Sequence, residues 1–236
     1  MKSAVVTGAS SGIGLAVSKY LNENGYRVYG IARDFSKSDY KNKNFLPVSC
    51  DVMDLVKLEK TSKEILRQEN KRIDILINNA GIAYFAPHEE IKVSEIAQMV
   101  QTNLTAPLVL TRLFLRSLKK TEGYLINITS VTAEIRSKWG GTYAATKAGL
   151  QHFSNILFED VRKSGVKVVT IMPDMTDTPF YDHLSFKPDD HEAAHLTPED
   201  VVEALDSVLN RRTGSVITQI TLRPQLHRIE KRKRKK

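Results

Sequence analysis

The chain has 236 residues, of which 41% are hydrophobic and 26% charged, a composition typical of a soluble globular protein with one sizeable core. No apolar run approaches the roughly 18 residues of a membrane span or the core of a secretory leader. The single cysteine, Cys50, excludes an internal disulfide and a cysteine-based zinc site. We therefore expect a cytoplasmic protein.

The formal net charge of +8 is concentrated near the C-terminus. Residues 228–236 carry seven basic side chains and one acid, Glu230, which gives +6 and leaves +2 for everything before them. Such a run is typical of a disordered, solubilising tail, and weak contact with nucleic acid or an anionic membrane is the alternative. The sequence predicts one folded domain over residues 1–227 and a disordered basic tail over 228–236.

Apolar runs and amphipathic segments alternate along the whole chain. Strands are predicted at 2–6, 27–32, 45–48, 73–77, 124–128, 166–172 and 215–221, and helices at 13–24, 54–69, 93–102, 104–120, 142–163 and 198–209. Several of the strands are continuous in Val and Ile. This pattern predicts a doubly wound α/β domain, with a mostly parallel seven-stranded sheet and helices on both faces. Residues 177–197 lack periodicity, which is typical of a functional lid or a disordered loop.

The first strand is followed by the turn TGASSGIG at residues 7–14. In a doubly wound sheet this turn is where a pyrophosphate meets the N-terminus of a helix. Gly8 suits the tight exit from the strand, Gly12 would let an anionic ligand approach the backbone, and Gly14 would let helix and strand pack closely. Ser10 and Ser11 can add hydroxyl donors. The alternative is a purely structural turn of small residues.

The second strand ends at Ala32 and Arg33. An acid at this position would bind the ribose hydroxyls of NAD(H), whereas a cation would pair with the 2′-phosphate of NADP(H). Arg33 therefore favours NADP(H) over NAD(H). Asp34 follows immediately and weakens this interpretation, and an ordinary exposed arginine is the alternative.

Tyr143 and Lys147 are four residues apart in a predicted helix, so they share a face. A neighbouring ammonium group stabilises the phenolate and lowers the tyrosine pKa toward the working range, which suits general acid–base chemistry. Ser130 ends the preceding strand, where its hydroxyl could bond a substrate oxygen together with Tyr143. Asn103 interrupts a helical segment and could supply a bend or a water site, or simply cap a helix.

These motifs together resemble the short-chain dehydrogenase/reductase family. The intervals of 27, 13 and 4 residues that separate Asn103, Ser130, Tyr143 and Lys147 are those of the family's catalytic tetrad. The resemblance extends over residues 1–222 through Cys50-Asp51-Val52, Asn78-Asn79-Ala80-Gly81, Pro173 and Thr178. It implies a Rossmann-like fold, an NADP(H)-dependent oxidoreductase acting on a carbonyl or secondary alcohol, and a homodimer or homotetramer.

The resemblance also implies a role for each matching position. Tyr143 would be the proton donor or acceptor, Lys147 would hold the nicotinamide ribose and lower the tyrosine pKa, and Ser130 would position the substrate oxygen. Asn103 would hold a water in the proton relay. No metal is expected. The expected cofactor contacts are Gly8, Ser10, Ser11, Gly12, Ile13, Gly14, Arg33, Asp51, Val52, Asn79, Ala80, Gly81, Tyr143, Lys147, Pro173, Thr176 and Thr178.

The chain departs from the family pattern at Asp174, where a glycine usually follows Pro173. Asp174 either tolerates the local turn or shapes the substrate pocket. Residues 132–142 and 177–197 are expected to form the substrate walls, with Trp139 offering a flat apolar face. Three histidines in the second segment are interpreted as incidental surface residues rather than a metal site: His183, His191 and His195.

Two other functions compete with the oxidoreductase. A catalytically silent NADP(H)-binding regulator would keep the fold without turnover, but it has no chemical need for the complete tetrad. A nucleic-acid-binding protein would work through residues 228–236, but the rest of the chain lacks a basic stripe with interleaved aromatic residues. The sequence does not identify the substrate.

Overall fold

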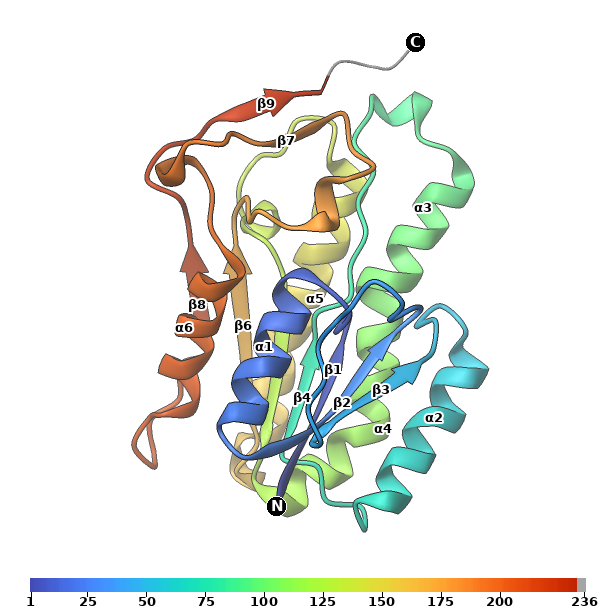
Figure 1. Cartoon of the computed structure of the whole chain (residues 1–236), viewed down its shortest axis with the longest axis vertical. Coiled ribbons are helices and arrows are strands. Elements are labelled where there is room, and N and C mark those ends of the chain that lie inside the picture. Colours follow the sequence, from blue (N-terminus) through green and yellow to red (C-terminus); the bar gives the residue numbers. More distant parts are fainter. Residues whose placement is uncertain (233–236) are drawn as a thin grey trace.

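The computed structural model describes residues 1–232 and shows a seven-stranded parallel sheet of order β3-β2-β1-β4-β5-β6-β8 (Figure 1). The predicted doubly wound α/β fold is confirmed. The strand order changes direction between β1 and β4, and a ligand crevice is expected at the carboxyl ends of strands that flank such a point. The strands are β1 (Lys2–Thr7), β2 (Tyr26–Ala32), β3 (Phe45–Ser49), β4 (Ile75–Asn78), β5 (Tyr124–Ile128), β6 (Lys167–Pro173) and β8 (Gln219–Leu222).

Helices cover both faces of the sheet, as the apolar strands require. They are α1 (Gly12–Glu23), α2 (Leu55–Gln68), α3 (Val93–Val100), α4 (Ala106–Thr121), α5 (Gly141–Val161) and α6 (Pro198–Leu209). The helices α1 and α6 pack on one face, and α2, α4 and α5 pack on the other. Within residues 1–232, no helix combines the length and the apolar composition that crossing a membrane requires.

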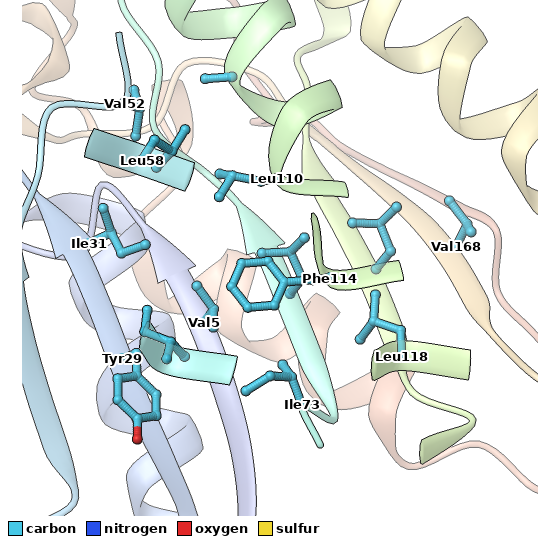
Figure 2. Packing of buried hydrophobic residues seen from close by; sticks show 14 of the residues in the cluster. Val5, Tyr29, Ile31, Val52, Leu58, Ile73, Leu110, Phe114, Leu118 and Val168 are labelled. Atoms are coloured by element: carbon cyan, nitrogen blue, oxygen red, sulfur yellow. The ribbon is translucent and has the colours of Figure 1, made fainter. Parts of the chain in front are cut away.

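The core on the second face is centred on α4 (Figure 2). Phe114 is fully buried and belongs to the same cluster as Val5 of β1 and Val168 of β6. Leu58 of α2 completes this layer from the side of β2. Burying an apolar side chain of this size contributes about 2 to 3 kcal/mol, so this cluster holds the strands that carry the site at fixed positions.

Two helices predicted at 93–102 and 104–120 are one continuous rod. A π-helical turn, Gln101–Thr105, connects α3 to α4 without a break. Such a turn is an α-helical segment with one extra residue, and it is often found at functional sites. Asn103 lies inside this turn, so it is not a helix cap.

A second, small sheet lies beyond the carboxyl ends of the main strands (Figure 1). It pairs β7 (Phe186–Pro188) with β9 (Ile229–Lys231) in antiparallel fashion. The prediction of a disordered tail from residue 228 is therefore wrong for 229–231, because the backbone of β7 offers an open edge that composition alone does not reveal. Residues 233–236 lie outside the described part of the chain.

The segment 177–197, which contains β7, is ordered, as expected of a lid. It contains the short helical turns Pro179–Tyr181 and Glu192–Ala194 on either side of β7. The backbone of Thr176 forms a parallel bridge with Leu196, which joins the two ends of the lid. We refer to residues 177–197 as the lid below.

Candidate active site

A cavity of about 1640 Å³ opens at the carboxyl ends of the main strands. All the residues predicted as catalytic or cofactor-binding line it, except Gly14 and Asn103. Pockets for a single small ligand are usually about 300 to 1,000 Å³. The cavity is therefore large enough for a dinucleotide with a small substrate beside it.

The glycine turn at the cavity edge depends on all three glycines. Gly8 has φ +67° and Gly12 has φ +51°, in the left-handed region that favours glycine. A Cβ on Gly14 would collide with the Gly8 carbonyl oxygen, so α1 can pack this closely on β1 only with glycine there. The roles expected for Gly8 and Gly14 agree with this geometry, and the role of Gly12 beside an anionic ligand stays a prediction.

The N-terminus of α1 has hydrogen-bond donors that are available to a ligand. Ser11 is the N-cap residue, but its side chain caps no backbone N–H group, and the first turn holds no acidic residue. The first N–H groups of a helix lack partners within the helix and carry a partial positive charge. Together with Ser10 and Ser11, which line the cavity, this donor set fits the pyrophosphate of a nicotinamide dinucleotide.

Thr7 and Asn79 hold the glycine turn against β4. The Asn79 side-chain amide donates to the Thr7 carbonyl at 2.9 Å, and the Thr7 hydroxyl accepts the backbone N–H groups of Asn79 and Ala80, each at 3.0 Å. Asn79 lines the cavity as expected, but its amide nitrogen is engaged by the turn. The sequence reasoning missed Thr7, although a polar residue that ends an apolar strand before such a turn is a usable signal.

Two cationic side chains, Arg33 and Lys37, line the cavity after the end of β2. Arg33 is exposed and lines this end, and no ion pair joins it to a carboxylate within residues 1–232. The Asp34 carboxylate accepts hydrogen bonds from the Ser36 backbone at 2.8 Å and the Ser36 hydroxyl at 2.6 Å. Asp34 is therefore occupied within its own turn. Lys37 also lines this end of the cavity and was missed.

Asp51 and Val52 follow β3 on the same side of the cavity. The Asp51 carboxylate accepts the Met53 backbone N–H at 2.9 Å, which fixes the turn that precedes α2. Val52 is buried and belongs to the core on the α4 face. These two residues thus form a firm side wall of the cavity.

Helix α5 carries Tyr143 and Lys147 on one face, as the four-residue spacing predicts. The Lys147 ammonium nitrogen lies 5.7 Å from the centroid of the Tyr143 ring and donates to the Ile128 carbonyl at 2.9 Å. Ser130 follows β5 and lines the same cavity, and it also accepts the Thr132 backbone N–H at 3.2 Å. These three side chains are all buried while still lining the cavity.

Burial governs the protonation of Tyr143 and Lys147. It raises the pKa of Tyr143 to about 12, and a hydrogen bond with Ser130 offsets part of this rise. It also lowers the pKa of Lys147 to about 8. Removal from water therefore dominates both pKa values, and the ammonium group is directed at the Ile128 carbonyl. That Lys147 lowers the tyrosine pKa stays a prediction.

The side chain of Asn103 links the segment that follows β4 to helix α5 through hydrogen bonds. Its side-chain amide donates to the Ile82 carbonyl at 2.8 Å and accepts the Ile82 N–H at 2.9 Å. It also donates to the Thr146 hydroxyl at 3.2 Å. A Cβ on Gly81 would lie 3.5 Å from both the Asn103 amide oxygen and the Lys147 nitrogen, so Gly81 keeps the space between these two groups open.

An aromatic shell surrounds Tyr143. The Phe85 and Phe180 rings lie 5.7 and 6.0 Å from the Tyr143 ring, centroid to centroid. Phe186 of β7 lies 5.1 Å from Phe85. Sequence reasoning missed this shell, since Phe85, Phe180 and Phe186 have no spacing in common and meet only through the fold.

The segment after β6 closes the nicotinamide end that the family resemblance implies. Thr176 and Thr178 line the cavity with Pro173. Asp174 also lines it, but its carboxylate forms an ion pair with Arg223 at 3.3 Å and accepts the Met175 N–H at 2.9 Å. Asp174 therefore fixes the turn and links it to the end of β8, and its charge is balanced by a residue that the sequence reasoning did not consider.

The three lid histidines have separate backbone partners. His183 bonds to the Ala83 carbonyl and His195 to the Asp189 carbonyl, each at 2.9 Å. His191 accepts the Ala193 N–H at 3.1 Å. They hold different parts of the lid.

Comparison with known proteins gives the family. The sequence model of the short chain dehydrogenases matches residues 2–188. The chain belongs to the short-chain dehydrogenase/reductase family. An uncharacterized oxidoreductase of Staphylococcus aureus strain MW2 is 32% identical over 232 residues, which cover 94% of this chain and 97% of the relative.

Solved structures of other proteins agree with the fold. An alcohol dehydrogenase from the archaeon Thermococcus sibiricus, in complex with 5-hydroxy-NADP, has a TM-score of 0.84 at 26% identity over 97% of this chain and 98% of the other. A metagenomic short-chain oxidoreductase in complex with NADP has a TM-score of 0.81 at 27% identity over 95% and 98%. Serine dehydrogenase from Escherichia coli has a TM-score of 0.81 at 28% identity over 94% and 97%.

Proposed function

We propose that this short-chain dehydrogenase/reductase transfers a hydride between NADP(H) and a carbonyl or secondary alcohol, with Tyr143 as general acid and base. The observation that carries the proposal is that Ser130, Tyr143 and Lys147 meet in the same cavity as an open helix N-terminus with its glycine turn. A regulator that only binds the nucleotide would need the turn but not the buried tyrosine and lysine.

The residues that would hold the dinucleotide lie along the cavity from β2 to β6. The glycine turn and the N-terminus of α1 would bind the pyrophosphate. Arg33 and Lys37 would bind the 2′-phosphate, since both cations follow β2 and line the same cavity as Ser10 and Ser11. That two related structures were determined with NADP or 5-hydroxy-NADP supports this preference.

Bound NADPH would supply the hydride to the carbonyl carbon. The protein itself would orient the carbonyl group and transfer one proton to its oxygen. The Tyr143 hydroxyl, which burial keeps protonated, would donate its proton to the carbonyl oxygen as the C–O bond becomes single. Ser130 would hydrogen-bond the same oxygen, and Lys147 would return a proton from its ammonium group. Alcohol oxidation is the reverse of these steps.

The proposal is tested by following NADPH oxidation with a panel of ketones, oxoacyl thioesters, quinones and sugars. Loss of a positioned general acid typically costs about 10²- to 10⁴-fold in rate, so Tyr143→Phe should reduce kcat by that factor. Tyr124→Phe is the control, because Tyr124 lies at the start of β5 and does not line the cavity, so this variant should stay within about threefold of the parent. Turnover that survives in Tyr143→Phe would contradict the mechanism, and tight NADPH binding without any turnover would favour the regulator.

A homodimer or homotetramer remains part of the proposal. The surfaces expected to associate are the helices at 104–120 and 142–163, which correspond to α4 and α5. Ile156 of α5 is 53% exposed, an apolar side chain on the surface where a second copy would pack. Sedimentation equilibrium would give the mass, and a monomer at micromolar concentration would contradict this part.

A further inference from the structure

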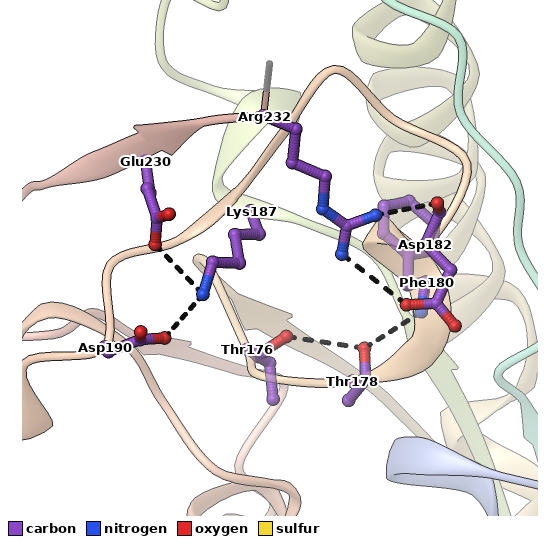
Figure 3. A network of polar contacts seen from close by, with 8 residues as sticks. All are labelled: Thr176, Thr178, Phe180, Asp182, Lys187, Asp190, Glu230 and Arg232. Carbon is purple, nitrogen blue, oxygen red and sulfur yellow. Dashed lines mark hydrogen bonds and ion pairs between the residues drawn. The ribbon is translucent and has the colours of Figure 1, made fainter. Parts of the chain in front are cut away.

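Strand β9 is an outer wall of the cavity. His227, Ile229 and Lys231 line it, while Glu230 forms an ion pair with Lys187 at 2.9 Å (Figure 3). Successive residues of a strand point to opposite sides, so this alternation places Ile229 and Lys231 toward the cavity and Glu230 away from it. The segment predicted from sequence as a tail thus contributes Ile229 and Lys231 of β9, and Arg232 directly after it, to the lining of the cavity.

An aromatic path connects Tyr143 to this wall. The Tyr143 ring lies 5.7 Å from Phe85, and Phe85 lies 5.1 Å from Phe186. Phe186 is the residue directly paired with Lys231 in the β7–β9 register. A substrate whose reacting oxygen lies at Tyr143 and whose body lies along these rings therefore points its far end at Lys231.

The charges around Lys231 leave its ammonium group unbalanced. Arg232 bonds to the Asp182 carbonyl at 2.7 Å and to its carboxylate at 3.6 Å, and Lys187 is paired with both Asp190 and Glu230 (Figure 3). No ion pair joins Lys231 to a carboxylate anywhere in residues 1–232. An anion arriving from solution is the partner that this position lacks.

Trp139 presents another apolar face to the cavity. Trp139 lines the cavity, is 55% exposed and has φ +60°, a conformation that is strained for a bulky aromatic residue. Its carbonyl accepts the Ala86 N–H at 3.2 Å, which helps to hold the strained backbone. Such strain is concentrated at functional sites, and Trp139 combines it with an exposed indole ring at the cavity.

We propose that the substrate has an apolar, aromatic-sized body and an anionic group at the end away from the carbonyl or alcohol, and that Lys231 of β9 binds this anion. The inference rests on the proposed function for the position of the reacting oxygen. Lys231 is then a specificity-determining residue, and the β7–β9 sheet, to which the lid contributes β7, contacts the far end of the substrate.

Binding of two matched ligands tests the assignment without requiring turnover. The protein saturated with NADP⁺ is titrated with 4-phenylbutanoate and with 4-phenylbutanamide, which differ in charge but hardly in shape. Binding is followed by the fluorescence of Trp139, the only tryptophan of the chain, and by calorimetry. A partly exposed ion pair contributes up to about 1 kcal/mol, so the carboxylate should bind about three- to fivefold more tightly than the amide.

Variants locate the source of this preference. Lys231→Met should make the two ligands bind equally, and Lys231→Arg should retain the preference. Arg136→Met is the matched control, because Arg136 is an exposed cation that lines the cavity on the wall of Trp139 and should leave the preference intact. A preference that persists in Lys231→Met, one that disappears in Arg136→Met instead, or a parent protein that binds the carboxylate no better than the amide, overturns the inference.

The same titration in Tyr143→Phe separates this inference from the proposed function. The carboxylate preference should survive there, since the phenol does not contact the far end of the ligand. A Lys231-dependent preference in a protein that oxidises no NADPH would contradict the proposed reaction alone. Turnover of neutral ketones without any carboxylate preference would contradict the role of Lys231 alone.

Discussion

Gly12 and Thr178 meet face to face, so that a Cβ added to Gly12 would lie 3.0 Å from the Thr178 Cβ. Gly12 is the first residue of α1, and Thr178 caps the helical turn with which the lid begins, through its hydroxyl and the Phe180 N–H. The proposed phosphate site and the base of the lid are therefore in direct contact. A substitution at either residue should therefore alter the position of the other.

Gly12→Ala should weaken NADPH binding by at least about tenfold, because the new methyl group must displace Thr178 or the turn that would hold the pyrophosphate. Gly25→Ala is the control, since Gly25 also has positive φ, +79°, but nothing lies within 4 Å of its added Cβ. Both variants should lose about 1 kcal/mol of unfolding free energy from backbone strain. Fluorescence titration with NADPH measures the difference, and equal affinities in the two variants would contradict the coupling.

Lys147→Met should abolish turnover and yet stabilise the protein at neutral pH in the absence of cofactor. The folded-state pKa of Lys147 is about 8, below the ordinary value of 10.5, so the folded chain binds fewer protons than the unfolded chain between these values. The resulting destabilisation is complete below pH 8 and is lost as the pH rises through 10.5. Its size is about 3 kcal/mol, from which the lost bond to Ile128 subtracts about 1 kcal/mol.

Urea denaturation at pH 7 and pH 10 checks this prediction. The variant should exceed the parent in unfolding free energy at pH 7, and the excess should shrink by about 2 kcal/mol at pH 10. Lys119→Met is the control for removal of a surface ammonium group, because Lys119 is exposed near the end of α4 and should show no such pH dependence. An excess that does not change with pH would show that Lys147 is not destabilised by burial.

The preference for NADP(H) over NAD(H) should depend on both Arg33 and Lys37. Each single Ala variant should raise the KM for NADPH about tenfold and the KM for NADH less than twofold, because only the phosphate carries the charge that these cations recognise. Lys41→Ala is the matched control: Lys41 is also exposed after β2 but does not line the cavity. If both cofactors respond equally to Arg33→Ala, the 2′-phosphate lies elsewhere.

Removal of residues 229–236 should impair the lid, whereas removal of 233–236 should not. The longer deletion removes β9 together with its ion pair to Lys187 and the Arg232 bonds to Asp182. We expect the kcat/KM for carbonyl substrates to fall about tenfold, with an unchanged Kd for NADPH, since the lost contacts lie on the substrate side. Limited proteolysis should then cut within 177–197, and equal resistance in both deletions would contradict a role of β9 in holding the lid.

The fold could be predicted because its signals are local. The five inner strands, β2, β1, β4, β5 and β6, are mostly apolar runs that are largely buried, and each helix carries its own periodicity, so the order of elements follows from the chain. The tetrad could be found for a similar reason. Its intervals are set by one turn of α5, by the segment between β5 and α5, and by the stretch from the π-helical turn to β5, and they are visible without knowing which residues touch.

The missed features depend on contacts between distant segments. Strand β9 has three residues, two of them charged, and is a strand only because β7 lies beside it. The raised pKa of Tyr143 follows from burial among rings such as Phe85 and Phe180, which the sequence does not connect. The ion pair of Asp174 with Arg223 likewise joins the ends of two strands that are neighbours only in the sheet.

The π-helical turn at Gln101–Thr105 sets how the chain tolerates a change of length. Deleting one residue there would restore ordinary α-helical hydrogen bonding, and the rod from α3 to α4 would stay continuous. The deletion would also turn α3 by about 100° relative to α4 and would carry the Asn103 amide away from Ile82. The register between the end of β4 and α5 would then be lost in a protein that still folds, so the number of residues in this helix is dictated by the site it serves.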